Sequence, residues 1–260
     1  MPADGKAIIA RYNRLYENAR THFSLCEEMA KFIAPSRVGI VGKRSPGQSR
    51  VRGVFDSTSL MSAELMAQFI SSYTMSPAQQ WGSMRMENPV FRDDDETNEW
   101  LDETRDRMLA GFSNSMFYAE APEAMVDWVG FGTNFLLSEE MPFGTARAPR
   151  KGYRGARYEA VKTGRFVIAD GPDGMVDTVG REWEMTADVM ARRWGKQALP
   201  ENVKKALEGK DGADEPFCMI HMVYPRSVSD QEFAAGNKAM PWASVWAEKE
   251  SKEIVSESGY

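Results

Sequence analysis

Residues 129–138 (VGFGTNFLLS) separate two kinds of sequence pattern, and this change decides the fold class. Before it, apolar residues recur every three or four positions, which is typical of amphipathic helices. After it, short apolar runs lie between turn residues, which is typical of strands. The pattern predicts an α+β protein with a helical N-terminal half, residues 1–132, and a mixed α/β half, residues 133–260.

The helical half is expected to hold four helices. The first covers residues 7–34, where apolar side chains follow one helical stripe, and Pro35 ends it because the residue before a proline avoids helical geometry. The second runs from about residue 57 to 73. Its expected buried side consists of Leu60, Ala63, Ala67 and Ile70.

The third helix is expected to begin at the acidic residues 93–96, because carboxylates favour the positive end of the helix dipole. Its expected buried residues are Trp100, Leu101, Met108 and Phe112. The fourth covers about residues 115–129, and Gly130 and Gly132 bracket its end.

The mixed half contains one clear hairpin. Residues 166–169 and 175–179 read as strands, and the Gly-Pro-Asp-Gly turn at 171–174 joins them. Further strands are expected at 134–138, 158–161, 217–224 and 242–248. Short helices are expected from Thr186 to Gly195 and from Pro200 to Leu207.

Composition excludes several protein classes. The chain has 260 residues, 42% of them hydrophobic, and a net charge of −6. That charge argues against a protein that wraps nucleic acid with a generally basic surface. Two cysteines are too few for a disulfide scaffold, and no apolar run is long enough to predict a membrane-spanning helix.

The motifs of common enzymes are not found in the sequence. A Ser–His–Asp triad needs a histidine base, and the two histidines, His22 and His221, accompany no Gly-x-Ser-x-Gly motif. Cys26 and Cys218 could complete a zinc site with them. However, Cys218 and His221 are three apart in an expected strand and would point to opposite faces. We therefore expect no enzyme activity, no metal and no cofactor.

Two basic stretches stand out in this acidic chain. Residues 37–52 carry a net charge of +5 and residues 147–165 a net charge of +6. The candidate contact residues are Arg44, Arg50, Arg52, Arg150, Lys151, Arg154 and Arg157. They could contact phosphates, pair with the acidic residues 87–106 of a neighbouring subunit, or simply lie in solvated loops. A nucleic-acid-binding or scaffold module using these stretches is thus an alternative function.

Several segments together point to one family. They are residues 11–15 (RYNRL), 28–35 (EMAKFIAP), 55–58 (FDST), 63–67 (AELMA), 75–77 (MSP) with Trp81, 113–118 (SNSMFY), 174–179 (GMVDTV), 242–246 (WASVW) and 257–260 (ESGY). In this order and spacing, the chain resembles the head-to-tail connector, or portal, proteins of short-tailed (podovirus-like) tailed bacteriophages. The segment 79–82 (QQWG) departs from the usual pattern, which has a basic residue before the Trp and an aromatic residue after it.

The resemblance implies a structural protein with a wing-like fold in both halves. It implies a ring of about twelve subunits at one capsid vertex, the conduit for DNA packaging and ejection and the docking platform for the tail. The implied partners are other copies of the chain, capsid and scaffold proteins, terminase, tail or adaptor proteins, and double-stranded DNA bound without sequence specificity. The implied location is the virion, after assembly in the host cytoplasm. Portal proteins are usually longer, so the family's stem and clip regions are expected to be missing or to lie beyond residue 260.

Overall fold

The computed structural model describes residues 4–42, 55–92, 94–140, 155–209, 212–227, 231 and 235–260. Backbone contacts divide the chain into two compact units. Unit 1 consists of the N-terminal segment up to Ser24 together with Gly164–Tyr260, and unit 2 consists of Leu25–Thr163. The fold is α+β with antiparallel sheets, as the sequence predicts.

The first helix, α1 (Gly5–Ile33), belongs to both units, because the division falls within it, after Ser24. The two units therefore do not coincide with the two halves expected from the sequence. The boundary at residue 132 was placed where the expected secondary structure changes, and it stays a prediction. Helices do predominate before residue 132, and all strands of the described residues lie after it.

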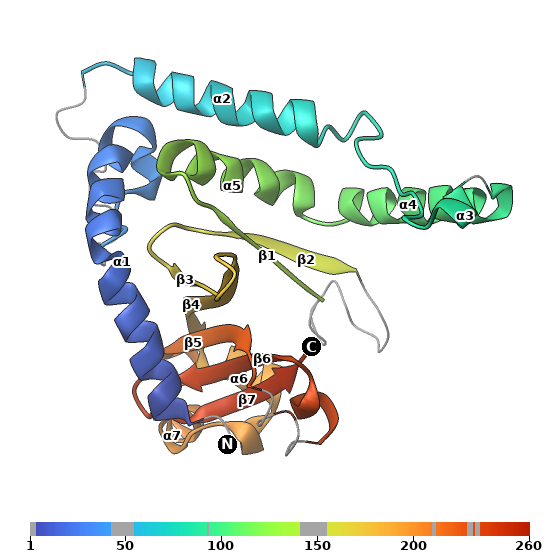
Figure 1. The fold of residues 1–260 in the computed structure, drawn as a ribbon. Coiled ribbons are helices and arrows are strands. Elements are labelled where there is room, and N and C mark those ends of the chain that lie inside the picture. The colour runs from blue at the N-terminus through green and yellow to red at the C-terminus, as the bar shows by residue number, and fades with distance from the viewer. Residues whose placement is uncertain are drawn as a thin grey trace. The chain divides into compact units, whose positions relative to one another are not determined.

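Unit 1 is built on one antiparallel sheet of five strands (Figure 1). In spatial and chain order the strands are β3 (Phe166–Asp170), β4 (Val176–Thr186), β5 (Pro216–Pro225), β6 (Trp242–Glu248) and β7 (Ile254–Gly259). The predicted hairpin is confirmed as β3 and β4. The predicted strands at 217–224 and 242–248 are confirmed as β5 and β6.

Helices cover both faces of this sheet. The helices α6 (Ala187–Trp194) and α7 (Glu201–Glu208) bury Met190 and Val203 in a core with Met219 and Trp246. On the other face, the first part of α1 comes so close to β4 that a Cβ at Gly180 would stand 3.0 Å from the Tyr12 ring. A larger residue at position 180 would push α1 away from the sheet.

Unit 2 is mainly helical. Its elements after α1 are α2 (Thr58–Thr74), α3 (Pro89–Arg92), α4 (Asp95–Ser113), α5 (Phe117–Phe131), β1 (Phe135–Glu140) and β2 (Ala156–Val161). The helix α5 packs against α2 and against the β1–β2 hairpin. The left-handed backbone at Gly132 (φ +78°) ends α5, as the glycine pattern predicts.

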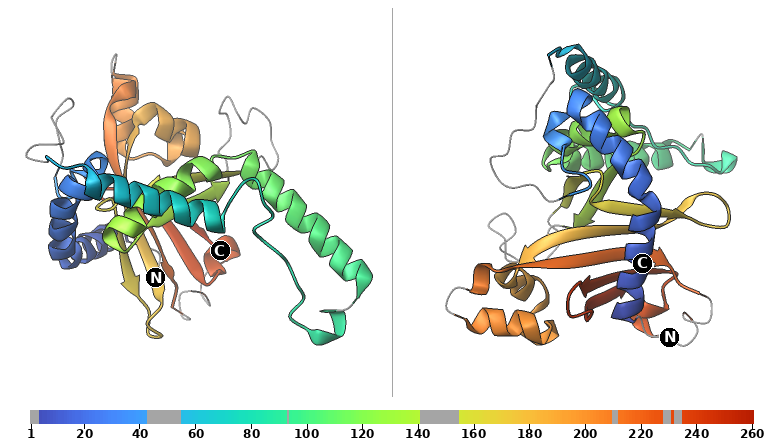
Figure 2. Two further views of the ribbon diagram at one scale, coloured as in Figure 1. Left: turned by 90° about the horizontal axis from the view of Figure 1, so that it is seen from above. Right: turned by 90° about the vertical axis from the view of Figure 1, so that its left-hand side faces the viewer.

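A ring cluster fixes the junction of α4 and α5 in unit 2. The rings of Phe112 and Phe117 lie 4.6 Å apart, and Trp81 and Tyr158 pack around them. The indole N–H of Trp81 donates a hydrogen bond to the Tyr118 hydroxyl at 3.0 Å. Beyond this junction α4 extends away from α5, as the left view in Figure 2 shows.

Candidate interaction surface

The first residue of the basic stretch 37–52 has a structural role inside unit 2. The side chain of Arg37 is 6% exposed and forms ion pairs with Asp127 and Glu123 of α5. The other carboxylate oxygen of Asp127 accepts hydrogen bonds from the backbone N–H of Thr163 at 3.1 Å and from its hydroxyl at 3.3 Å. These ion pairs therefore stabilise the packing of the segment that follows α1 against α5.

Six of the seven predicted contact residues lie outside the described residues: Arg44, Arg50, Arg52, Arg150, Lys151 and Arg154. The seventh, Arg157, lies on β2. Its guanidinium donates hydrogen bonds to Glu139 of β1 at 3.1 Å and to Glu159 at 2.7 Å. Two carboxylates thus already compensate the charge of Arg157.

The side of α2 that faces α5 is made of small residues. Ala63, Ala67 and Ser71 are the buried residues of this helix, and Leu60 and Ile70 are half-buried. The Ser71 hydroxyl donates to the backbone carbonyl of Ala67, so it adds no unsatisfied group to the contact. The side predicted from the sequence is confirmed, and small side chains allow the two helices to approach closely.

The large apolar residues of α2 lie on the opposite side. At 100° per residue, Leu65 and Phe69 point away from the Ala63–Ala67 side. We define the outer face of α2 as the five exposed residues Met61, Leu65, Met66, Phe69 and Tyr73. The exposed fraction is 69% for Leu65 and reaches 81% for Tyr73.

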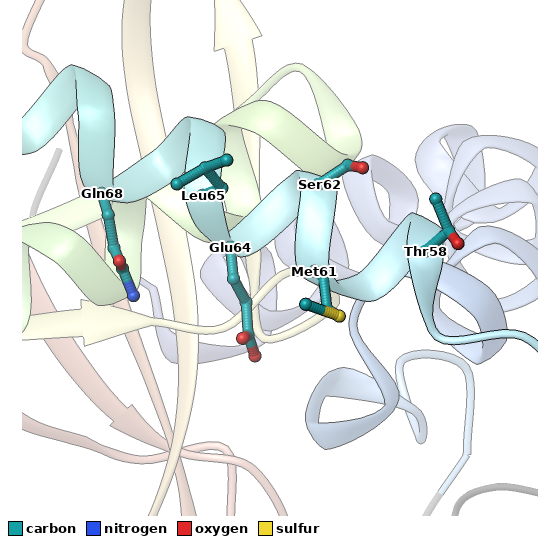
Figure 3. A pocket seen from close by; sticks show the side chains of 6 residues that line it. All are labelled: Thr58, Met61, Ser62, Glu64, Leu65 and Gln68. Carbon is teal, nitrogen blue, oxygen red and sulfur yellow. The ribbon is translucent and has the colours of Figure 1, made fainter.

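Two features give the outer face a defined shape. The rings of Phe69 and Tyr73 stack with centroids 6.0 Å apart and planes inclined by 13°, which forms a flat aromatic surface. A hollow of about 510 Å³ opens beside Met61 and Leu65. Figure 3 shows the six residues that line it, all from α2: Thr58, Met61, Ser62, Glu64, Leu65 and Gln68.

The last third of α1 presents a second exposed apolar stripe in unit 2. Leu25, Met29 and Phe32 are exposed and follow helical spacing, whereas Cys26 and Ala30 on the other side are buried. We call the three exposed residues the α1 stripe. Burial raises the pKa of the Cys26 thiol, so this cysteine stays protonated near neutral pH.

Of the acidic residues 93–96, Asp95 and Glu96 form the first turn of α4, and Asp93 lies outside the described residues. Asp94 caps the helix by accepting the backbone N–H of Thr97 at 2.9 Å, and hydrogen bonds from Thr97 lower the pKa of this carboxyl. The prediction that Trp100 and Met108 are buried is wrong, since their exposed fractions are 62% and 47%. Leu101 is buried as predicted. The apolar spacing gave a wrong prediction here because few neighbouring elements pack on α4. The side of the helix that carries Trp100 and Met108 therefore stays uncovered.

The second histidine lies inside unit 1. The His221 ring stacks on Trp246 at 4.1 Å, accepts a hydrogen bond from the Arg181 guanidinium at 3.2 Å and contacts the Ser244 hydroxyl at 2.9 Å. Burial, together with the charges of Arg181 and Arg193, lowers the pKa of His221 to about 3. The imidazole is therefore neutral and enclosed, with no access for a substrate.

Among the described residues, no three His, Cys, Asp or Glu side chains gather closely enough to hold a metal ion. None of the helices in the described part of the chain is both long and apolar enough to cross a membrane.

Comparisons with known proteins give one consistent result. The family model of the bacteriophage head to tail connecting protein matches residues 5–260. The chain is 25% identical over 260 residues to a probable portal protein of Bordetella phage BPP-1, an alignment that covers 98% of this chain and 44% of the relative. It is 24% identical over 257 residues to the portal protein of Salmonella phage epsilon15, covering 94% and 42%, respectively. The chain thus spans less than half the length of these curated relatives.

Proposed function

Because the chain belongs to the family of bacteriophage head-to-tail connecting proteins, we propose that it is the subunit of a phage portal, a homo-oligomeric ring at one capsid vertex. The observation that carries this proposal is the match of the family model over residues 5–260. The two portal proteins that align with nearly the whole chain support it.

In this function the ring is the conduit for DNA packaging and ejection and the platform on which the tail docks. The two units would form the wing region, and the parts that line the channel and bind terminase would belong to the additional length found in the relatives. The other partners would be capsid and scaffold proteins and tail or adaptor proteins. The protein would be assembled in the host cytoplasm and reside in the virion, with no catalytic role.

The acidic character of the chain suits such a conduit. With a net charge of −6, the subunit carries more acidic than basic side chains, and DNA passes through a channel more freely when few phosphate contacts hold it. We therefore expect weak DNA binding with a shallow dependence on salt concentration.

The protein can be tested for assembly by native mass spectrometry and negative-stain electron microscopy. We expect closed rings of about a dozen subunits, because a head-to-tail contact between identical subunits forms a ring when its rotation closes. A protein that remains monomeric at every concentration, even at low ionic strength, would contradict the proposal.

A second candidate function is suggested by the sequence of residues 147–154 (RAPRKGYR), which contains four cations and no acid. If this segment binds DNA, replacing Arg150, Lys151 and Arg154 with Ala should weaken duplex affinity and reduce its salt dependence. Arg157→Ala is the matched control, because Glu139 and Glu159 already compensate that charge. Equal affinity in all variants would exclude this second function.

A further inference from the structure

The outer face of α2 is unusual for a surface helix because its large apolar side chains face away from the protein and its small ones face inward. In an ordinary surface helix the apolar stripe faces the core. The five exposed side chains present on the order of 500 Å² of apolar surface, which is at the upper end of what monomeric proteins expose. This face therefore needs a partner.

The chemistry of the face restricts the partner. The helix Thr58–Thr74 contains no Lys or Arg and one acid, Glu64, so it offers nothing that would attract phosphates. A face with a stacked aromatic pair and only Glu64 at the edge of its hollow instead suits an apolar protein surface, since interface cores are depleted of charge and enriched in aromatic residues and Met.

We propose that the outer face of α2 packs on the α1 stripe of a second copy of this chain, and that this is a contact between neighbouring subunits of the ring. The inference rests on the proposed function. A stable interface buries roughly 800 Å² on each partner, and the outer face alone would supply more than half of that. It is thus large enough to be the centre of a subunit contact.

Ring symmetry determines which surface the outer face meets. A contact between two α2 helices would be self-complementary and would stop at a dimer, whereas a ring needs two different surfaces on each subunit. In the described part of unit 2, α1 and α4 both offer exposed large apolar residues at helical spacing.

The α1 stripe is the better match of the two. On α4, Trp100 lies beside Glu96, Glu99 and Glu103, whose carboxylates would have to leave water in a contact. The α1 stripe has Glu28 and Lys31 beside it, whose charges are opposite in sign. Glu27, the remaining charge in that stretch, already accepts the backbone N–H groups of Gly39 and Ile40 at 2.8 and 2.6 Å.

The spacing of the two surfaces also fits direct helix packing. Met61, Leu65, Phe69 and Tyr73 form a row four residues apart, and Leu25 and Met29 are two residues of such a row on α1. Rows of this kind interdigitate at a crossing angle of about −50°. The contact we infer is thus one helix crossing over another, with Phe69 near its centre.

Charge substitutions in the assembling protein test the two surfaces separately. Phe69→Glu on α2 and Met29→Glu on α1 should each convert rings to monomers at concentrations where the unchanged chain is fully assembled. Ser59→Glu introduces the same charge at an exposed position of α2 outside the outer face and should assemble normally. Far-UV circular dichroism and thermal melting of the monomers must match the unchanged subunit, which separates lost contacts from lost folding.

A disulfide test identifies the pairing itself. The Leu65→Cys and Met29→Cys chains are prepared separately, mixed, assembled into rings and oxidised. The unchanged chain, treated in the same way, shows how much disulfide the native Cys26 and Cys218 form. We expect a reducible covalent dimer from the mixture and from neither variant alone. A dimer from the Leu65→Cys chain by itself, or rings that yield no covalent dimer, would overturn the proposal.

The outcomes distinguish this inference from the proposed function. If the unchanged chain never assembles, the proposed function fails. If it assembles and both Glu variants still form rings, the function stands and the α2–α1 contact is wrong. Normal rings with a lowered melting temperature for Phe69→Glu would mean that the outer face is covered within its own chain, which also overturns the inference.

Discussion

The helices α6 and α7 of unit 1 and the helix α2 of unit 2 place apolar side chains in opposite ways. In unit 1, α6 and α7 turn Met190 and Val203 toward the sheet and leave their charged residues in solvent. In unit 2, α2 turns alanines inward and leaves Leu65 and Phe69 outside. The two helices of unit 1 therefore bury Met190 and Val203 within their own unit, whereas α2 of unit 2 leaves Leu65 and Phe69 exposed.

The largest expected effect concerns the ion pair that holds unit 2 together. Asp127→Ala leaves the buried Arg37 with only the half-exposed Glu123 as partner, and should lower the free energy of unfolding by about 3 kcal/mol. Urea unfolding measures this loss. The double variant Arg37→Met, Asp127→Leu should recover most of it, because it removes the uncompensated charge. A single-variant loss below about 1 kcal/mol would contradict the assigned role.

The second prediction is a pH dependence of unit 1. His221 has a folded pKa of about 3 against 6.5 in the unfolded chain, so between these values the unfolded state binds more protons. Stability is thus fully present above pH 6.5 and declines as the pH falls, by about 2 kcal/mol at pH 5. Urea unfolding from pH 8 to 5 measures the slope. A His221→Gln chain should lose most of it, and an unchanged slope would show that other groups cause it.

The third prediction compares the two sides of α2 directly. Ala67→Leu enlarges the side that packs on α5 and should destabilise the dissociated subunit by about 1–3 kcal/mol. Leu65→Gln, on the outer face, should change its stability by less than about 0.5 kcal/mol. Thermal unfolding of the subunit at low concentration measures both. The opposite order would mean that the outer face, not the alanine side, is the packed side.

The smallest effect is expected at the start of α4. Asp94→Ala removes the side chain that accepts the Thr97 N–H and should lower the melting temperature by about 2 °C. Asp94→Asn retains a cap and should melt within about 1 °C of the unchanged chain. Equal losses in both variants would show that the charge at the helix dipole matters more than the hydrogen bond.

The periodicity of apolar residues predicts most of the helices and strands, but not which of their side chains other elements cover. The stripe on residues 7–34 and the turn at 171–174 predicted α1 and the β3–β4 hairpin correctly. On α2, apolar residues lie almost all round the helix, so the stripe of Ala63 and Ala67 did not reveal that Leu65 is outside. The side chains on the Ala63–Ala67 side are small and those on the Leu65 side are large. This difference in size was the signal that could have shown which side packs on a neighbouring helix.

Other features depend on contacts that a local pattern does not contain. The strand β7 (Ile254–Gly259) was missed because Ser256, Glu257 and Ser258 interrupt its apolar pattern, and its pairing with β6 defines it. The grouping of the start of α1 with residues 164–260 likewise depends on long-range packing such as that of Tyr12 on Gly180. Arg37 was counted as part of a basic loop because its partner Asp127 is 90 residues away.

The most direct test is a cryo-electron microscopy map of the assembled protein. We predict a closed ring in which the outer face of α2, centred on Phe69, lies buried on the α1 stripe of the neighbouring subunit. A ring in which Leu65, Phe69 and Tyr73 face solvent on every subunit would contradict it.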